Sequence, residues 1–557
     1  MRLEHIISVI LPLFASFFTF PADLFYNSDR FLYFCVIIED SIPDNRSIPM
    51  TKPKQLFFTL SALVLCLASF AQADRLGQDI LYEVQTSGQF GKGEHTPFWQ
   101  SANRYGLTSV NNNSGFLRAS LHRHVETDSL RKWRIGYGAD LVVPIDYSSK
   151  FILQQLYADF QYKAVRLSVG QKERPIEMKN QTLSSGSMVL GTNARPIPQV
   201  RIEMPEFFVI KKTRNWIAIK GHVAYGCYTD NRWQRDFNAG VNTNYTENSL
   251  YHSKAGYLRV GNTDKFPLTF TGGFEMICQF GGIVYNLPIK DSNGHIETTH
   301  KQKVGLKEIF HAFIPTGSDI NDGDNKNVMG NHLGSYQIRL DYHGKGWKAS
   351  AYGEHYFEDH SQMGWDFDWK DFLWGAEINF PKNPVVEAVV YEHMRTTDQS
   401  GAVFKSLGSE QMPSAIGGVD DYYNHGMYGA YQHAGFVMGS PLLISPIYNP
   451  NHYIYCFDNR IKANHVGLSG SPHRDIAYRV LYTHEKSWGT YKSPRTNPVQ
   501  SDFFLTEVTY HPHQVKGLSL TASYAQDWGK LTGKNKGGMM TVSYRGIFNP
   551  KKQRNHE

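Results

Sequence analysis

The chain has 557 residues, of which 14% are aromatic and 48 are glycine, and its formal net charge is +6 at pH 7. Its length allows several domains or one large barrel, and its aromatic content favours β-structure over a helical enzyme. The Lys and Arg residues form no long basic run, which argues against nucleic acid as a partner. A mean hydropathy of −0.41 leaves a membrane barrel open, because barrel strands face lipid only at every second residue.

The segment that begins at Met50 has the three parts of a secretory signal peptide. Two lysines are followed by an apolar core at residues 56–70 and by the cleavage site Ala71-Gln72-Ala73. We therefore predict that 50–73 is a signal peptide and that 74–557 is a single exported domain. Residues 1–49 are interpreted as a wrongly assigned upstream start, with an extended leader as the alternative.

Strand-like alternation of apolar and polar residues continues from there to the end of the chain. In residues 117–124, for example, Leu117, Ala119 and Leu121 share one face, and Arg118, His122 and His124 lie on the other. No run of apolar residues after Ala73 is long enough for a transmembrane helix. Further segments with strand alternation span 133–143, 151–160, 164–172, 216–228, 256–261, 268–280, 333–343, 347–357, 372–380, 385–395, 430–438, 461–468, 476–484, 503–511, 518–528 and 538–548.

The spacing of these segments favours a membrane barrel over an array of secreted β-sandwiches. Sandwiches would show turn signals at an even spacing of about 8–12 residues, whereas here short turns alternate with long segments such as 173–206 and 396–430. Short turns at one end and long loops at the other are typical of outer-membrane barrels, and the exported length fits about 16 to 18 strands. The last strand segment ends on an aromatic residue, Phe548, as such barrels commonly do.

An ordered set of motifs resembles the Wzi family of capsule-assembly proteins, in the form found in Bacteroides-like bacteria. The resemblance implies an all-β fold, a large transmembrane antiparallel barrel of about 18 strands whose lumen is occluded by loops and a small helical plug. It also implies a lectin-like protein without catalytic residues. The motifs are TPFWQSANRYGL (96–107), GTNARPIPQVRIEMPEFF (191–208), WIAIKGHVAYGCYTD (216–230), KEIFHAFIP (307–315), GNHLGSYQIRLDY (330–342), YYNHGMYGAYQHAG (422–435), GSPLLISPIYN (439–449) and NRIKANHVGLSG (459–470).

Residues 191–208 interrupt the alternation with three prolines, Pro196, Pro198 and Pro205. Proline cannot donate to a β-ladder, so we expect this segment to leave the barrel wall. Arg195 and Arg201 would then pair with lumen carboxylates or with an acidic glycan, and we favour packing in the lumen.

Two aromatic segments are candidates for a polysaccharide-binding site. Aromatic rings cover the apolar face of a sugar, planar hydrogen-bonding groups bind its hydroxyls, and an acidic capsule would add a need for Arg or Lys. For each aromatic residue the alternative is a place in the membrane girdle or in the core. The candidate residues are Trp365, Trp369, Trp374, Tyr422, Tyr423, Asn424, His425, Arg195 and Arg201.

Other chemistry finds little support in the sequence. The acidic run at 318–326 fails the EF-hand register and is expected to be a solvated turn. His122 and His124 are interpreted as a polar pair facing the lumen rather than as metal ligands. The serines of 468–473 lack a nucleophile elbow. Cys227, Cys278 and Cys456 are far apart and are expected to be unpaired.

The resemblance, added to these features, implies a non-enzymatic protein of the outer membrane that attaches capsular polysaccharide to the cell surface and supports capsule assembly. No cofactor and no metal are expected. The expected partners are the polysaccharide, outer-membrane lipid and lipopolysaccharide, and the barrel-assembly machinery during insertion. A diffusion channel is the main alternative, and a barrel hydrolase with a Ser/His/acid set on neighbouring strands is a further one.

Overall fold

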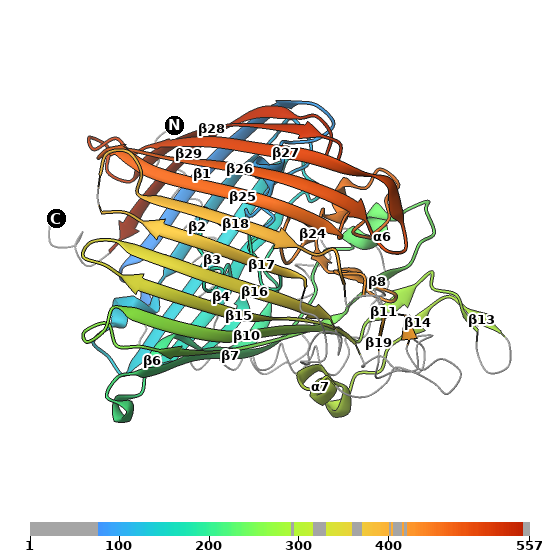
Figure 1. Cartoon of the computed structure of the whole chain (residues 1–557), viewed down its shortest axis with the longest axis horizontal. Coiled ribbons are helices and arrows are strands. Elements are labelled where there is room, and N and C mark those ends of the chain that lie inside the picture. The colour runs from blue at the N-terminus through green and yellow to red at the C-terminus, as the bar shows by residue number, and fades with distance from the viewer. Residues whose placement is uncertain are drawn as a thin grey trace, which may run out of the picture. The chain divides into compact units, whose positions relative to one another are not determined.

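The protein forms a closed β-barrel. The computed structural model describes residues 76–290, 295–315, 330–358, 370–381, 383–399, 403–404, 415–416 and 420–549. Eighteen strands form one antiparallel sheet, and β29 (Lys536–Phe548) pairs with β1 (Ile80–Lys92) along the full length of both strands (Figure 1). A closed sheet satisfies its backbone hydrogen bonds internally, as a lipid environment requires. The predicted antiparallel barrel of about 18 strands is confirmed.

Between β1 and β29, each wall strand pairs with the wall strands before and after it in the chain. These strands are β2 (Ser114–Arg123), β3 (Trp133–Ile145), β4 (Ile152–Tyr162), β5 (Val165–Gln171), β6 (Gln199–Val209), β7 (Ile217–Cys227), β9 (Leu250–Val260), β10 (Leu268–Phe280), β15 (Asn331–His343), β16 (Lys348–Glu358), β17 (Phe372–Asn379), β18 (Ala388–Arg395), β25 (Ile461–His473), β26 (Ile476–Gly489), β27 (Pro494–Tyr510) and β28 (Leu518–Gly529).

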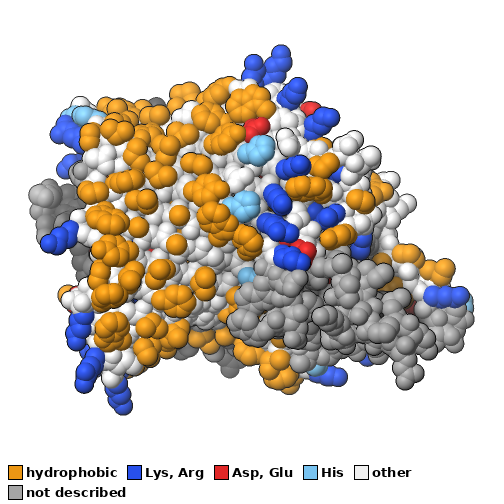
Figure 2. All heavy atoms as spheres, viewed as in Figure 1, with side chains coloured by type: hydrophobic (Ala, Val, Ile, Leu, Met, Phe, Trp, Pro, Cys, Tyr) orange, Lys and Arg blue, Asp and Glu red, His pale blue; other side chains and the backbone are white. Residues whose placement is uncertain are grey.

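The outer face of the wall is apolar and the inner face is polar. On β2, for example, Leu117 is exposed outward, whereas Arg118 is largely buried and forms an ion pair with Asp140 of β3. Figure 2 shows hydrophobic side chains spread over the wall, with Lys and Arg gathered toward its margins. Such a surface is that of a barrel that crosses a membrane. Among the described residues, no helix is both long enough and apolar enough to do so.

The two ends of the barrel differ in the length of their connections. At the end that holds Ile80 and Phe548, here called the turn end, the longest connection is 124–132, which has nine residues. At the opposite end, the loop end, the connections include 93–113, 172–198, 228–249, 281–330 and 396–460. Because outer-membrane barrels place short turns in the periplasm and long loops outside, the loop end faces the exterior of the cell.

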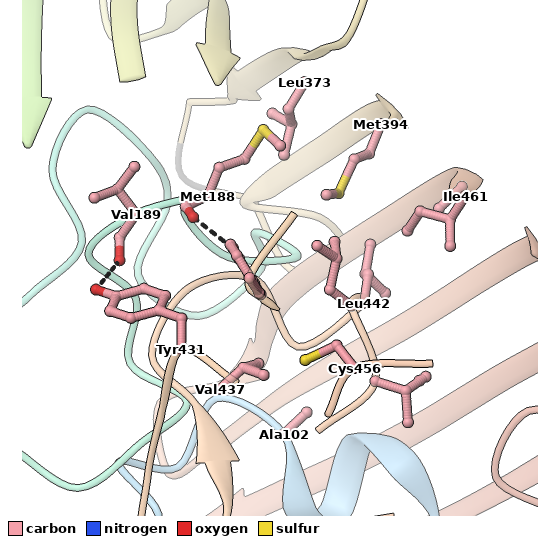
Figure 3. Packing of buried hydrophobic residues seen from close by; sticks show 14 of the residues in the cluster. Ala102, Met188, Val189, Leu373, Met394, Tyr431, Val437, Leu442, Cys456 and Ile461 are labelled. Atoms are coloured by element: carbon pink, nitrogen blue, oxygen red, sulfur yellow. Dashed lines mark hydrogen bonds between the residues drawn. The ribbon is translucent and has the colours of Figure 1, made fainter. Parts of the chain in front are cut away.

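Loops from the loop end fill the lumen with a hydrophobic core, here called the plug. It consists of residues 98–101, 183–198 and 421–449, and it contains fully buried side chains such as Leu183, Met188 and Tyr431. These side chains pack against lumen-facing residues of the wall, among them Leu373 and Ile461 (Figure 3). The lumen is therefore occupied by the protein's own chain.

The plug and the loops hold short elements only. They are the helices α5 (Phe98–Ser101), α6 (Trp233–Phe237) and α7 (Leu306–Phe313), the 3₁₀ turns η2 (Val125–Asp128), η3 (Lys211–Thr213) and η5 (Pro446–Tyr448), and the strands β8 (Tyr245–Glu247), β11 (Ile283–Tyr285), β12 (Ile289–Lys290), β13 (Ile296–Glu297), β14 (His300–Lys301), β19 (Val403–Phe404), β20 (Ala415–Ile416), β21 (Asn424–His425), β22 (Gly429–Ala430), β23 (Gln432–His433) and β24 (Phe436–Val437).

Two sequence predictions about the wall are corrected. Residues 430–438 are not a wall strand: they lie in the plug, where residues 430–437 are all buried, so their apolar character reflects packing on every side. Residues 199–208 do not leave the wall, because they belong to β6. Pro205 is accommodated where the register between β6 and β7 shifts, between Met204 and Phe208, since a bulge needs no ladder hydrogen bond from that residue.

The rest of the proline-rich segment behaves as expected. Residues 191–198 lie outside the wall strands, and Asn193, Ala194 and Ile197 are buried in the lumen. None of the described cysteines Cys227, Cys278 and Cys456 forms a disulfide, as predicted. The segments 1–49, 50–73 and 318–326 fall on residues outside the described part of the chain, so their assignments stay predictions.

Substitution of Ile338, which is 55% exposed near the middle of β15, tests the lipid-facing wall. We expect Ile338→Arg to lower the free energy of unfolding in lipid vesicles by about 2–4 kcal/mol, because it places a charge near the bilayer midplane. Val385→Arg is the control, since Val385 is 62% exposed but lies in the turn between β17 and β18. Equal effects of the two variants in urea titrations would contradict this placement.

Candidate functional site

The plug is anchored by a buried ion pair between the loop after β5 and the wall. Lys179 donates to a carboxylate oxygen of Glu354 on β16, and both side chains are almost fully buried. The same ammonium group donates to the Gly186 carbonyl at 2.8 Å. Glu354 also accepts hydrogen bonds from the Met188 amide at 3.1 Å and the Ser335 hydroxyl at 2.9 Å. The two charges are thus compensated in a region where an isolated charge would be very costly.

A second carboxylate holds the next turn of the same loop. Glu392 of β18 accepts from the Ser184 hydroxyl at 2.7 Å, from the Ser185 amide at 2.6 Å and from the Tyr352 hydroxyl at 2.6 Å. His465 of β25 is paired in register with Glu392, and its Nε2 lies 2.8 Å from the Leu183 carbonyl oxygen. Wall strands β16, β18 and β25 therefore hold residues 183–188 at a defined position in the lumen.

The long connection between β18 and β25 packs on this anchored loop. The hydroxyl of Tyr431 donates to the Val189 carbonyl at 2.9 Å, and the hydroxyl of Tyr423 donates to the Met188 carbonyl; Figure 3 shows Tyr431 beside Val189. Asn193 Nδ2 donates to the Val437 carbonyl at 2.9 Å. The two loops are therefore one packed unit rather than independent flaps.

The tyrosines of the predicted site lie inside this unit. Tyr422 and Tyr423 have no exposed surface. Asn424 is also buried, and its side chain hydrogen-bonds Asp421 and the Cys456 backbone. His425 Nδ1 accepts from the Met427 amide at 3.1 Å. Burial, with a smaller effect of the Lys492 charge, lowers the pKa of His425 to about 4, so this ring is neutral at pH 7.

The two predicted arginines also face the lumen. Arg195 Nη1 donates to the Ser149 hydroxyl at 2.9 Å, and burial lowers the pKa of Arg195 to about 10, which leaves it charged at pH 7. Arg201 forms an ion pair with Glu203 two residues along β6, with N and O 2.5 Å apart. Arg195 is linked to the segment that contains Tyr422 and Tyr423 only indirectly. Its backbone carbonyl oxygen lies 2.9 Å from Nδ1 of His433, which belongs to the same connection as the tyrosines.

The predicted tryptophans lie apart from these residues. Trp374 is on the outer face of β17, where it is 42% exposed and its ring centre lies 5.3 Å from that of Tyr391 on β18. That position is typical of the aromatic girdle at a membrane interface. Trp365 and Trp369 lie outside the described residues.

Sequence reasoning missed an aromatic and basic surface at the loop end, here called the rim surface (Tyr453, Tyr455, Phe457, Tyr491 and Lys492). Tyr453 is 38% exposed and Tyr491 is 40% exposed. The ring centre of Phe457 lies 6.2 Å from that of Tyr453 and 5.1 Å from that of Tyr455. The Tyr455 hydroxyl donates to Asp421, and Lys492 Nζ lies 3.9 Å from the same carboxylate.

The sequence does carry a signal for this surface. Tyr453, Tyr455 and Phe457 recur at every second residue, and the residues between them, Ile454 and Cys456, are buried. An extended segment with this period presents three aromatic rings on one face. The signal is short, and a proline two residues before His452 separates it from any longer strand pattern.

The described residues contain no cluster of His, Cys, Asp and Glu side chains arranged to hold a metal ion. His122 and His124 stack with ring centres 6.2 Å apart, and His122 Nδ1 lies 3.3 Å from the Tyr157 hydroxyl oxygen.

Fold and site together define a class of protein: an outer-membrane β-barrel of 18 strands whose lumen is filled by its own loops. No protein-family model matches the chain, and no curated protein sequence matches it. The solved structure of Wzi from Escherichia coli, described as an outer-membrane protein involved in group 1 capsule assembly and as a carbohydrate-binding β-barrel, is similar with a TM-score of 0.50 and 13% identity. The match covers 87% of this chain and 88% of that chain, so the chain has a Wzi-like fold.

Two barrels of Pseudomonas aeruginosa are similar at a lower level. OpdL has a TM-score of 0.40 and 9% identity over 86% of this chain and 99% of its own. OpdK has a TM-score of 0.42 and 8% identity over 84% of this chain and 99% of its own.

Removal of one partner tests the plug anchor. We expect Lys179→Met to lower the free energy of unfolding by about 3–5 kcal/mol, because Glu354 is left buried without its counter-charge. The double variant Lys179→Met/Glu354→Gln should recover part of the loss, since no uncompensated charge remains. Urea titrations of the refolded barrel measure both, and a double variant no more stable than the single one would refute the ion-pair account.

His433 predicts a pH dependence of stability. Burial lowers the pKa of His433 from 6.5 to about 4, so between these two values the unfolded chain binds the proton and the folded chain does not. The contribution of the neutral His433 ring to the free energy of unfolding is therefore lost as pH falls from about 6.5 to about 4. Across this window we expect the native protein to lose about 3 kcal/mol relative to His433→Gln. A difference in the free energy of unfolding between the two proteins that stays constant across this pH window would contradict the predicted role of His433.

Proposed function

We propose that this protein is a non-enzymatic, lectin-like outer-membrane protein that attaches capsular or other surface polysaccharide to the cell and supports capsule assembly. The filled lumen carries the proposal. A diffusion channel needs an open path, whereas here buried ion pairs and hydrophobic packing join the plug to the wall. A barrel closed in this way leaves its loop end as the surface that meets molecules outside the cell.

The rim surface is the proposed contact for the polysaccharide. The exposed rings of Tyr453 and Tyr491 and the half-buried ring of Phe457 offer apolar faces for sugar rings, and Lys492 provides a cation for an acidic sugar. His452, beside these rings, is exposed and stacks on Phe237 of the β7–β9 loop, with ring centres 4.7 Å apart and an angle of 15° between the planes. Two loops therefore contribute aromatic groups to the same end of the barrel.

The residues predicted from the sequence have different proposed roles. Trp365 and Trp369 belong to the connection between β16 and β17, which is at the loop end, and we propose them as further glycan contacts. Trp374 is proposed for the membrane girdle. The buried or lumen-facing residues are proposed to support the binding surface from below by holding the plug in place; they are Tyr422, Tyr423, Asn424, His425, Arg195 and Arg201.

The fold likeness supports the proposal in one respect. Wzi of Escherichia coli is described as a carbohydrate-binding barrel, and this description supports the proposal that the present barrel binds sugar. As further partners we propose outer-membrane lipid and lipopolysaccharide around the apolar wall, and the barrel-assembly machinery during insertion.

A binding assay with purified capsular polysaccharide from the source strain tests the rim surface. We expect the double variant Tyr453→Ala/Phe457→Ala to bind about 10-fold or more weakly, because each of these two accessible rings contributes about 1 kcal/mol of contact energy. The control is Tyr342→Ala/Tyr510→Ala, which removes two rings of similar exposure at or near the turn end. Biolayer interferometry measures both variants, and equal affinity for the rim variant and the native protein would count against this surface.

A planar-bilayer recording of the native protein separates the proposal from the channel alternative. The plugged lumen predicts no large steady conductance steps. Large steps that persist over minutes would instead support a diffusion channel.

A further inference from the structure

Three cationic side chains lie next to one another on the outer face of the wall. Arg395 of β18 is paired in register with Lys462 of β25, and Lys462 is paired with Lys486 of β26. Neighbouring strands are about 4.8 Å apart, so the Cα atoms of all three fall within about 10 Å. Like charges directly opposite each other destabilise a sheet. An anion bound across the row would remove this repulsion.

The described residues do not neutralise this row. Among the described residues, the nearest outward carboxylate on the neighbouring strand is Asp502, and it is bound by His484 at 2.9 Å and by the Tyr482 hydroxyl at 2.6 Å. Asp458, at the loop end of β25, is bound by Arg495 at 2.6 Å. Within the described part of the chain, no carboxylate forms an ion pair with any of the three cations.

The row lies at the level of the wall where lipid headgroups are expected. Along the outer faces of β18, β25 and β26, one row in register contains Tyr391, Val466 and Tyr482. The next row toward the loop end contains His393, Asn464 and His484, and the cationic row follows. This order, from apolar and aromatic through polar to cationic, follows the polarity of a membrane leaflet from hydrocarbon to headgroup.

An aromatic ring holds two of the cations together. The ammonium group of Lys486 lies 5.1 Å from the ring centre of Trp488, and that of Lys462 lies 5.9 Å from the same ring. Figure 2 shows Lys and Arg side chains gathered over the wall near the loop ends of these strands, beside the hydrophobic surface. The cations therefore form a compact group at the border of the apolar wall.

We propose that Arg395, Lys462 and Lys486 form a binding site for the phosphorylated sugar headgroup of a glycolipid in the outer leaflet. The loop end faces the exterior, so the lipid at this level belongs to that leaflet. A phosphate group carries the charge to neutralise the row, and the Arg guanidinium can bind it through two parallel hydrogen bonds. The acyl chains of the same lipid would lie along the apolar rows below. The site is separate from the rim surface. It rests on the lipid partner named in the proposed function, for which it gives the residues and the headgroup chemistry, and it does not depend on polysaccharide binding at the rim surface.

The test compares lipid binding by three full-length proteins in detergent micelles. The first is native, the second carries Arg395→Gln, Lys462→Gln and Lys486→Gln, and the third carries Lys212→Gln, Lys345→Gln and Lys516→Gln, which removes three exposed cations from turn-end connections. The probes are a bisphosphorylated diglucosamine lipid, the same lipid without phosphates, and inorganic phosphate alone. Native mass spectrometry measures the bound lipid.

We expect the native protein and the turn-end variant to bind the phosphorylated lipid at least about 10-fold more tightly than the lipid without phosphates. The wall variant should lose this preference. Its melting temperature without lipid should equal or exceed that of the native protein, because a repulsive row has been removed, and this shows that it is folded. A preference retained by the wall variant, or lost equally by the turn-end variant, would overturn the proposal. Displacement of the lipid by equimolar inorganic phosphate would also overturn it, because it would identify a site for free phosphate.

Discussion

The buried ion pair between Lys179 and Glu354 keeps the plug in the lumen, and the rest of the structure depends on it. Both side chains are almost fully buried, so the cost of desolvation is recovered only while the loop after β5 stays in the lumen. That loop also provides the backbone carbonyls of Met188 and Val189. These carbonyls accept hydrogen bonds from the hydroxyls of two tyrosines in the β18–β25 connection. A polar wall and a hydrophobic plug are thus joined by a few charged and hydrogen-bonded groups.

Because the lumen is closed, the proposed binding sites lie on two outer surfaces of the protein. The rim surface at the loop end presents aromatic rings and a cation to the exterior. The outer wall presents apolar rows that end in a cationic row at the headgroup level. The two proposals place a polysaccharide above the membrane and a phosphorylated lipid within it on separate residues of the same barrel. The barrel would then link an external polymer to the outer leaflet.

The wall could be predicted from the sequence because its signal is local. Inward and outward residues alternate within each strand, as in Leu117 and Arg118, and the closed sheet follows from the repetition of this pattern. The bulge at Pro205 was missed because proline alone does not reveal a shift of register with the next strand. Residues 430–438 were misassigned because a segment buried on all sides has no period that separates it from a strand.

The candidate site was harder to predict because its contacts are distant in sequence. Lys179 and Glu354 are 175 residues apart, and nothing near either residue identifies its partner. Tyr422 and Tyr423 have the composition of a sugar platform, yet their rings have no exposed surface. The period-two run Tyr453, Tyr455 and Phe457 was visible in the sequence, but only the burial of Ile454 and Cys456 shows which face is exposed.

The central claim is that this barrel holds polysaccharide on the cell. It is tested most directly by measuring cell-attached and released capsular polysaccharide in a strain that lacks the gene and in the same strain supplied with the native gene. The account predicts that loss of the protein moves polymer from the cells into the medium while the total amount stays similar, and that the native gene reverses this. Cell-attached polymer that is unchanged in the strain without the gene would contradict the account.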